Sequence, residues 1–191
     1  MNRSFMIWFL TLVLCTGWVF YERNAVANTQ YSLPLTLTSP SPATNVWGRS
    51  IDASDEALRC LALDIYFESR SDPIAAQYAV ADVVMYRLLH YNFPSTVCGV
   101  IKDGIYPAWN KTVPYKYRCS FTWWCDRKSD IPKDEEAYVL AMKIATDVLT
   151  NVDYVPVLSY ALYYHAEYVS PGWDKKYLVR KLGTHFFYTR T

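Results

Sequence analysis

The first long stretch with apolar residues at helical spacing ends in an acidic residue, Glu68. Its apolar face is formed by Ala57, Leu61 and Ile65, and widened by Leu58, Ala62 and Leu63. Asp52 comes before this face and is the expected N-cap. Pro73 disfavours the helical conformation at the residue before it, so the helix is predicted to end near residues 68–70.

Helical spacing also predicts three later helices. Residues 74–89 carry an apolar stripe with small alanines, which allow close approach to the first helix. Thr96 is expected to cap a short helix over residues 97–102, and Asp134 a long helix over residues 135–149. Most of the predicted structure is therefore helical.

Short runs rich in β-branched and aromatic residues predict a small β element. Residues 120–124 are expected to form a strand or a hairpin arm, and residues 160–165 and 185–188 to form two more strands. Residues 105–118 read as a loop. The pattern predicts an α+β domain that is mostly helical.

The N-terminal 27 residues have the pattern of an export signal. Arg3 precedes an uncharged apolar run over residues 5–20, and Ala25 and Ala27 give the small-x-small pattern of a cleavage site. The run is slightly short for a membrane span, so a cleaved signal is favoured over a retained signal-anchor. We expect an exported protein that contacts the cytoplasmic membrane transiently through this segment.

The remaining chain divides into a linker and one domain. Residues 28–50 contain Pro, Ser and Thr without periodicity, which predicts a flexible linker. Residues 51–191 are long enough for one good core. The net charge of +1 gives no basic surface for nucleic acid. The 17 Tyr and 7 Trp are either core and surface residues or the lining of a groove that stacks on sugars.

The cysteines after the leader are even in number, as in a disulfide framework of an exported protein. They are Cys60, Cys98, Cys119 and Cys125. Three pairings are possible, and we favour Cys119–Cys125, which closes a short loop, with Cys60–Cys98. No Cys-x-x-Cys occurs and the three His are scattered, which argues against a zinc site. No cofactor is expected.

Glu68 follows two aromatic residues, Tyr66 and Phe67, at the end of the first helix. Partial desolvation by the rings would raise the pKa of its carboxyl and suit it to general-acid catalysis near neutral pH. The alternative is a solvated glutamate paired with Arg70. The residues alone leave both readings open.

Four blocks of the chain resemble the SleB-type cell wall hydrolases, also called the spore-cortex-lytic family. Residues 60–70 (CLALDIYFESR) resemble the family's helix with its terminal glutamate. Residues 77–86, 93–101 and 119–126 resemble three further family blocks in the same order. The resemblance covers residues 58–187.

The resemblance implies a lysozyme-like, lytic transglycosylase-like fold and an activity on peptidoglycan glycan strands. The bond cleaved would be the MurNAc–GlcNAc β-1,4 linkage, with Glu68 as the acid and then the base. A glycosidase that uses water needs a second carboxylate, for which Asp64, Asp72 and Asp126 are candidates. Asp64 lies one turn before Glu68, where its charge would raise the pKa of Glu68, although a helix-surface position is favoured for it. Asp72 reads as a turn former.

The same resemblance implies a set of substrate contacts. Trp123 or Trp124 is expected to stack on sugar, with the other in the core. His185 is as readily a structural residue as a functional one. The positions expected to bind substrate are Phe121, Thr122, Asp126, Tyr163, Tyr164 and His165.

Two other functional classes are weighed against this one. A wall peptidase or amidase would use Cys119 as a free nucleophile with His165, and the even number of cysteines argues against it. A non-catalytic peptidoglycan-binding module would use the aromatic residues without Glu68.

Overall fold

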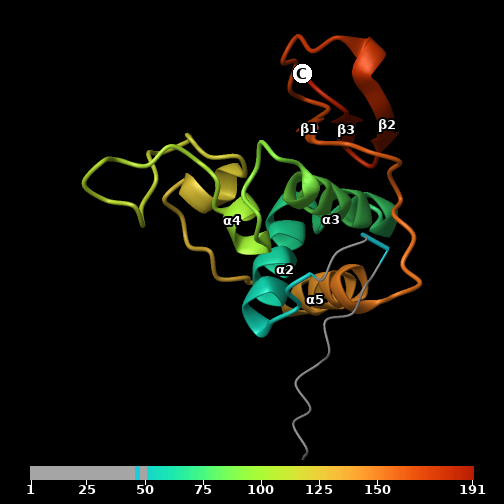
Figure 1. Ribbon diagram of the computed structural model, residues 1–191, viewed down its shortest axis with the longest axis horizontal. Coiled ribbons are helices and arrows are strands. Elements are labelled where there is room, and N and C mark those ends of the chain that lie inside the picture. Colours follow the sequence, from blue (N-terminus) through green and yellow to red (C-terminus); the bar gives the residue numbers. More distant parts are fainter. Residues whose placement is uncertain (1–45, 48–50) are drawn as a thin grey trace, which may run out of the picture. The chain divides into compact units, whose positions relative to one another are not determined.

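The computed structural model describes residues 46–47 and 51–191 (Figure 1). The predicted signal segment and most of the predicted linker lie outside these residues. The elements in chain order are α2 (Asp55–Ser69), α3 (Ile74–Leu89), α4 (Val97–Ile101), the 3₁₀ helix η2 (Thr122–Cys125), α5 (Glu135–Thr150), β1 (Tyr163–Ala166), the 3₁₀ helix η3 (Lys175–Tyr177), β2 (Leu178–Leu182) and β3 (His185–Tyr188). The prediction of a mostly helical α+β domain is confirmed. None of the helices in the described part has the length and apolar character of a membrane span.

The N-cap of helix α2 lies two residues later in the chain than expected. The hydroxyl of Ser54 accepts a hydrogen bond from the backbone N–H of Ala57 at 3.3 Å and so caps the helix. Asp52 instead accepts bonds from the N–H and the hydroxyl of Ser54, at 2.9 and 3.1 Å. The prediction of Asp52 as N-cap is therefore wrong, because the shorter Ser54 side chain reaches the helix end and Asp52 supports it.

Helix α3 lies between the sheet on one side and α2 and α5 on the other (Figure 1). Val84 and Met85 pack into the cluster with α2 and α5, and Val80 and Val83 pack against Phe187 of β3. A helix with apolar residues on all sides is stable only when it is covered on all sides. This explains why its predicted bounds, residues 74–89, agree with the structure.

The predicted caps of the other two helices are confirmed. The Thr96 hydroxyl accepts from the N–H of Gly99 at 3.0 Å, and the Asp134 carboxylate from the N–H of Ala137 at 3.0 Å. Helix α5 packs along α2, and α4 covers one end of both α2 and α3.

Trp47 belongs to the fold although it lies in the stretch predicted as a linker. Its ring packs edge-on against Tyr86 at 5.3 Å, and its indole N–H donates to the carbonyl of Val148 at 3.2 Å. At this position the linker prediction is wrong, because a large aromatic side chain with an indole N–H finds both a core and an acceptor.

The sheet has the order β1-β3-β2 and is antiparallel throughout. Strands β1 and β3 were predicted, although β1 begins at Tyr163 rather than at residue 160. Strand β2 was missed, since its sequence is LVRKL and it lies at the sheet edge, where charged residues are tolerated.

The strand predicted over residues 120–124 is wrong. The chain there forms η2, in which the N–H of Trp124 donates to the carbonyl of Phe121 at 3.1 Å. The Cys119–Cys125 disulfide joins residues six apart in the sequence, which favours a compact turn over an extended arm. The favoured pairing is present together with Cys60–Cys98, which ties α2 to α4.

Asp72, in the turn between α2 and α3, fastens the β2–β3 hairpin to the helices. Its carboxylate accepts from the N–H and hydroxyl of Thr184 at 2.8 and 3.1 Å, and lies 3.1 Å from Nδ1 of His185. Gly183 precedes these residues with a φ of +53°, and a Cβ there would meet Asp72 Cγ at 2.9 Å. The hairpin therefore needs glycine both for its turn and for its approach to Asp72.

We expect Gly183→Ala to lower the free energy of unfolding by about 2–4 kcal/mol, from left-handed strain and displaced Asp72 hydrogen bonds. Gly172→Ala is the matched control, since Gly172 has a φ of +75° and open space around it. This variant should lower the free energy of unfolding through left-handed strain alone, by about 1–2 kcal/mol. Urea unfolding measures both. Equal losses would contradict the role given to the Asp72 contact.

Candidate active site

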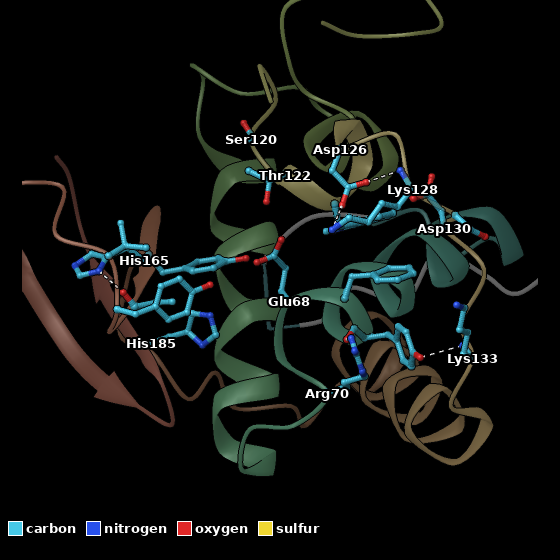
Figure 2. A pocket seen from close by; sticks show the side chains of 18 of the residues that line it. Glu68, Arg70, Ser120, Thr122, Asp126, Lys128, Asp130, Lys133, His165 and His185 are labelled. Atoms are coloured by element: carbon cyan, nitrogen blue, oxygen red, sulfur yellow. Dashed lines mark hydrogen bonds and ion pairs between the residues drawn. The ribbon is translucent and has the colours of Figure 1, made fainter. Parts of the chain in front are cut away.

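A cavity of about 710 Å³ opens at the end of α2, between the loop after η2 and the sheet. Figure 2 shows the Glu68 side chain in the middle of it. Thr122, Asp126 and Lys128 lie on one side of Glu68, and His165 and His185 on the other. The cavity therefore places one carboxyl between a loop wall and a sheet wall.

The last turn of α2 is held by the two aromatic residues that precede Glu68. The Tyr66 hydroxyl accepts from the backbone N–H groups of Lys133 and Asp134, each at 3.0 Å. The Phe67 ring stacks on Trp123, with ring centres 4.9 Å apart. These contacts fix the helix end on both sides, so that Glu68 faces the cavity.

Arg70 contacts Tyr66 and does not form the solvent-exposed ion pair with Glu68 that was the alternative. Its guanidinium lies over the Tyr66 ring, 4.9 Å from the ring centre, and donates to the Tyr66 carbonyl at 3.4 Å. The structure therefore favours the desolvated reading of Glu68.

The Glu68 side chain is half-buried, and burial raises the pKa of its carboxyl from 4.5 to about 7. The nearby Tyr164 hydroxyl and the charge of Arg87 lower this pKa in part. The Tyr164 hydroxyl is close enough to act on the carboxyl, although it forms no hydrogen bond of suitable geometry with any described residue. A carboxyl with such a pKa can both donate and accept a proton near neutral pH.

Asp64, one turn before Glu68, is fully buried and not on the helix surface as predicted. Its Oδ1 accepts a hydrogen bond from the indole N–H of Trp123 at 2.9 Å. Burial and then the charge of Glu68 raise its pKa, while Trp123 and Arg87 lower it. The position was misjudged because an aspartate in a helix is usually solvated, and an indole donor from distant η2 cannot be read from local spacing.

Arg87, on α3, is a residue of the site that sequence reasoning missed. Only 7% of it is exposed, and its Nε donates to the carbonyl of Leu162 at 2.7 Å. Its guanidinium lies 5.2 Å from the Phe93 ring centre and 5.0 Å from that of Phe121. An arginine in the last turn of a mostly apolar helix was the available signal, since such a charge is rarely buried without partners.

The predicted substrate contacts divide into two groups. Thr122, Asp126, Tyr164 and His165 line the cavity. Phe121 is only 2% exposed and packs beneath Arg87 and Tyr164, so its assignment to the groove is wrong. The turn of η2 directs Phe121 inward and Thr122 outward.

Three more aromatic residues expected near the substrate, Tyr163, Trp123 and Trp124, differ in their position relative to the cavity. Tyr163 is outside the lining of the cavity and packs against Phe93 and Trp173. Trp123 is buried at 8% exposure with only an edge at the cavity, and Trp124 is half-buried outside it. The expectation that one of the pair lies in the core is confirmed for Trp123.

The two histidines on the sheet wall are held by structural contacts. His165 stacks between neighbouring aromatic rings, and its Nε2 lies 3.3 Å from the Tyr188 hydroxyl. His185 is paired with Asp72, and burial lowers its pKa. On the opposite wall, Asp126 is paired with Lys128 at 3.3 Å.

Comparison with known proteins places this geometry in a family. The sequence profile described as Cell Wall Hydrolase matches residues 71–188, more than half of the chain. Glu68 lies three residues before the start of the matched range. The spore cortex-lytic enzyme of Halalkalibacterium halodurans is 27% identical over 135 residues, covering 70% of this chain and 35% of the relative. The chain thus spans about a third of that relative's length.

Two solved structures are also similar to the chain. The catalytic domain of the germination-specific lytic transglycosylase SleB from Bacillus anthracis is 25% identical with a TM-score of 0.49, covering 71% of this chain and 95% of that one. The SleB catalytic domain of Bacillus cereus has the same identity and TM-score, covering 72% and 94%. On the profile match, the chain belongs to the cell wall hydrolase family.

Proposed function

We propose that this protein is a peptidoglycan lytic transglycosylase in which Glu68 acts first as the acid and then as the base. The observation that carries the proposal is the half-buried carboxyl of Glu68, with a pKa of about 7, in the middle of a cavity of about 710 Å³. Family membership supports an activity on the cell wall and agrees with the lysozyme-like catalytic domain expected from the sequence.

In the first step, the Glu68 carboxyl gives its proton to the glycosidic oxygen between MurNAc and GlcNAc. The bond from this oxygen to C1 of MurNAc breaks, and C1 becomes cationic. In the second step, the Glu68 carboxylate takes the proton of the 6-hydroxyl of the same MurNAc, whose oxygen bonds to C1. The product is a 1,6-anhydro ring, and Glu68 regains its proton without a water molecule being consumed.

The surroundings of Asp64, Asp72 and Asp126, the three candidates for a second carboxylate, support this route over hydrolysis. A hydrolase needs a second carboxylate about 5–9.5 Å from the first, to act as nucleophile or to activate water. Asp64 is buried behind Glu68, and Asp72 is occupied by Thr184 and His185. Of these candidates only Asp126 lines the cavity, where it is paired with Lys128. Asp126 would be the second carboxylate if water were the acceptor.

The peptidase alternative lacks its nucleophile. Cys119 is bonded to Cys125, and no described cysteine remains outside a disulfide. A disulfide sulfur is not a thiolate and does not attack a peptide carbonyl. The non-catalytic alternative predicts sugar binding without bond cleavage, and the experiment on Glu68 distinguishes it.

Thr122, Tyr164, His165 and Asp126 are proposed to contact the glycan strand, because they line the same cavity as Glu68. Export through residues 1–27 to the periplasm or cell wall, with transient membrane contact, is part of the proposal. The two disulfides support it, since such bonds persist in oxidising compartments.

Residues 28–191, folded after export, should show no cysteine labelled by alkylation without reduction, and four labelled after reduction under denaturing conditions. Mass spectrometry counts the labels. Two or more labelled cysteines before reduction would contradict the disulfide framework and the export argument.

We expect Glu68→Gln to reduce peptidoglycan lysis by about 10²-fold or more, because an amide cannot donate the proton. Wild-type muropeptides should carry 1,6-anhydro ends by mass spectrometry. Glu56→Gln makes the same change in the exposed first turn of α2 and should keep wild-type activity.

An active Glu68→Gln protein would overturn the assignment. Reducing ends in the wild-type products would mean that water attacks, and would give Asp126 the second role.

The raised pKa also predicts how stability depends on pH. Because the folded state holds the Glu68 proton up to about pH 7 rather than 4.5, the stabilisation from this proton is complete below pH 4.5 and is lost as pH rises through 7. The free energy of unfolding of the wild type should therefore fall between these values by about 1–3 kcal/mol more than that of Glu68→Gln. Urea unfolding at several pH values measures this. A parallel fall in both proteins would contradict the desolvated environment of Glu68.

A further inference from the structure

Three buried side-chain atoms in the described part of the chain lack a hydrogen-bond partner of suitable geometry, and all three belong to groups that interact with Glu68. They are Asp64 Oδ2, Arg87 Nη1 and the Tyr164 hydroxyl oxygen. Buried polar atoms are almost always paired, so each unpaired one needs an explanation, and a catalytic role is one such explanation. Every pair among these three groups and Glu68 interacts electrostatically. The four side chains therefore act as one cluster.

The cluster has one permanent positive charge and two carboxyls. The guanidinium of Arg87 stays protonated in proteins, and here it is only 7% exposed. Asp64 and Glu68 lie on the same side of α2, one turn apart. In a poorly solvated interior, one cation balances one carboxylate, and a second negative charge nearby is strongly disfavoured.

Asp64 has no route to solvent that would relieve this repulsion. It is fully buried, and the Trp123 indole bonded to its Oδ1 at 2.9 Å is itself stacked against Phe67. A charge on Asp64 therefore acts on Glu68 through protein rather than through water, which screens charges far better.

We propose that Asp64 and Glu68 hold one proton between them above Arg87, and that Asp64 is the positioning residue that keeps this proton available on Glu68. The inference rests on the proposed role of Glu68 and deepens it. When Glu68 gives its proton to the glycosidic oxygen, both carboxyls become ionised while positive charge develops at C1 of the sugar. The added negative charge faces that cation, and it makes Glu68 the stronger base for the proton of the 6-hydroxyl.

The test is Asp64→Asn, read by carbon-13 NMR titration of the Glu68 carboxyl and by the pH profile of wall lysis. The amide oxygen still accepts from Trp123, but the negative charge is gone. We expect the midpoint of the Glu68 titration, and the alkaline limb of the activity profile, to move down by about one pH unit. Lysis below that limb should also fall, because the Asp64 charge no longer faces the cation at C1 and no longer strengthens Glu68 as a base.

The other groups around Glu68 are unchanged by this substitution. The charged and titratable groups that line the remaining walls of the cavity are Tyr66, Arg70, Arg87, Asp126, Lys128, Asp130, Lys133, Tyr164, His165, Tyr168 and His185. A shift in the Glu68 midpoint therefore reports the removal of the Asp64 charge.

Asp82→Asn is the matched control. Asp82 is also a fully buried aspartate, but it lies on α3, bonded to the Tyr154 hydroxyl at 2.6 Å and the N–H of Leu158 at 3.0 Å. Its replacement removes a buried carboxyl outside the cluster. We expect lower thermal stability and an unchanged Glu68 titration.

Glu68→Gln gives a second measurement if Asp64→Asn does not fold. In the wild type, the coupled carboxyls of Asp64 and Glu68 titrate in two steps, and the NMR signal of each carboxyl shows both steps. Without Glu68, the Asp64 signal should show one step, at a lower pH than its upper step in the wild type.

An unchanged Glu68 midpoint in folded Asp64→Asn, or an alkaline limb of the activity profile that stays in place, would overturn the proposal and leave Asp64 a structural residue. Because the NMR titration needs no substrate, it is independent of the proposed function. A shifted midpoint together with an active Glu68→Gln protein would support the shared proton and overturn the role of Glu68 in catalysis.

Discussion

The desolvation of one helix end governs the chemistry that this protein can perform. Tyr66 is tied to the start of α5 through two backbone N–H groups, and Phe67 is stacked on Trp123. Both rings displace water from the last turn of α2. A carboxyl placed there has its pKa raised because its charged form is poorly solvated. The same contacts that complete the core therefore give Glu68 its protonation behaviour.

Burying polar side chains around Glu68 lowers the stability of the fold. Arg87 and Asp64 are buried with one polar atom each left without a partner, where apolar residues of similar size would pack without loss. Arg87 limits the rise in the pKa of both carboxyls. Two opposing effects therefore act on the carboxyls of Asp64 and Glu68. Burial favours their protonated forms, and the fixed positive charge of Arg87 favours their ionised forms.

Local pattern predicted the helices well, because each depends on neighbours in sequence. The Thr96 and Asp134 caps and the bounds of α3 follow from hydrogen bonds and apolar spacing within the element. The failures involve distant contacts. The turn of η2 buries Phe121 and turns Thr122 outward, and the burial of Asp64 depends on Trp123, 59 residues later in the chain. Glu68 was found from its aromatic neighbours and the family resemblance, whereas Arg87 was missed because its partners, such as the carbonyl of Leu162, come from other elements.

The turn between α2 and α3 links Glu68 to the sheet wall of the cavity through a very short piece of chain. Glu68 lies on one side of this turn, and Asp72, four residues later, holds Thr184 and His185 of the hairpin. The hairpin strand β3 pairs with β1, where Tyr164 lies opposite Phe187 in the register. Tyr164 is thus brought to Glu68 by a path that begins at the same turn. A displacement of the hairpin would move the sheet wall away from the carboxyl and admit water, which would lower the pKa of Glu68 toward its ordinary value. The fastening of the hairpin by Asp72 is therefore part of how the protonation of Glu68 is set, although Asp72 is occupied by contacts of its own.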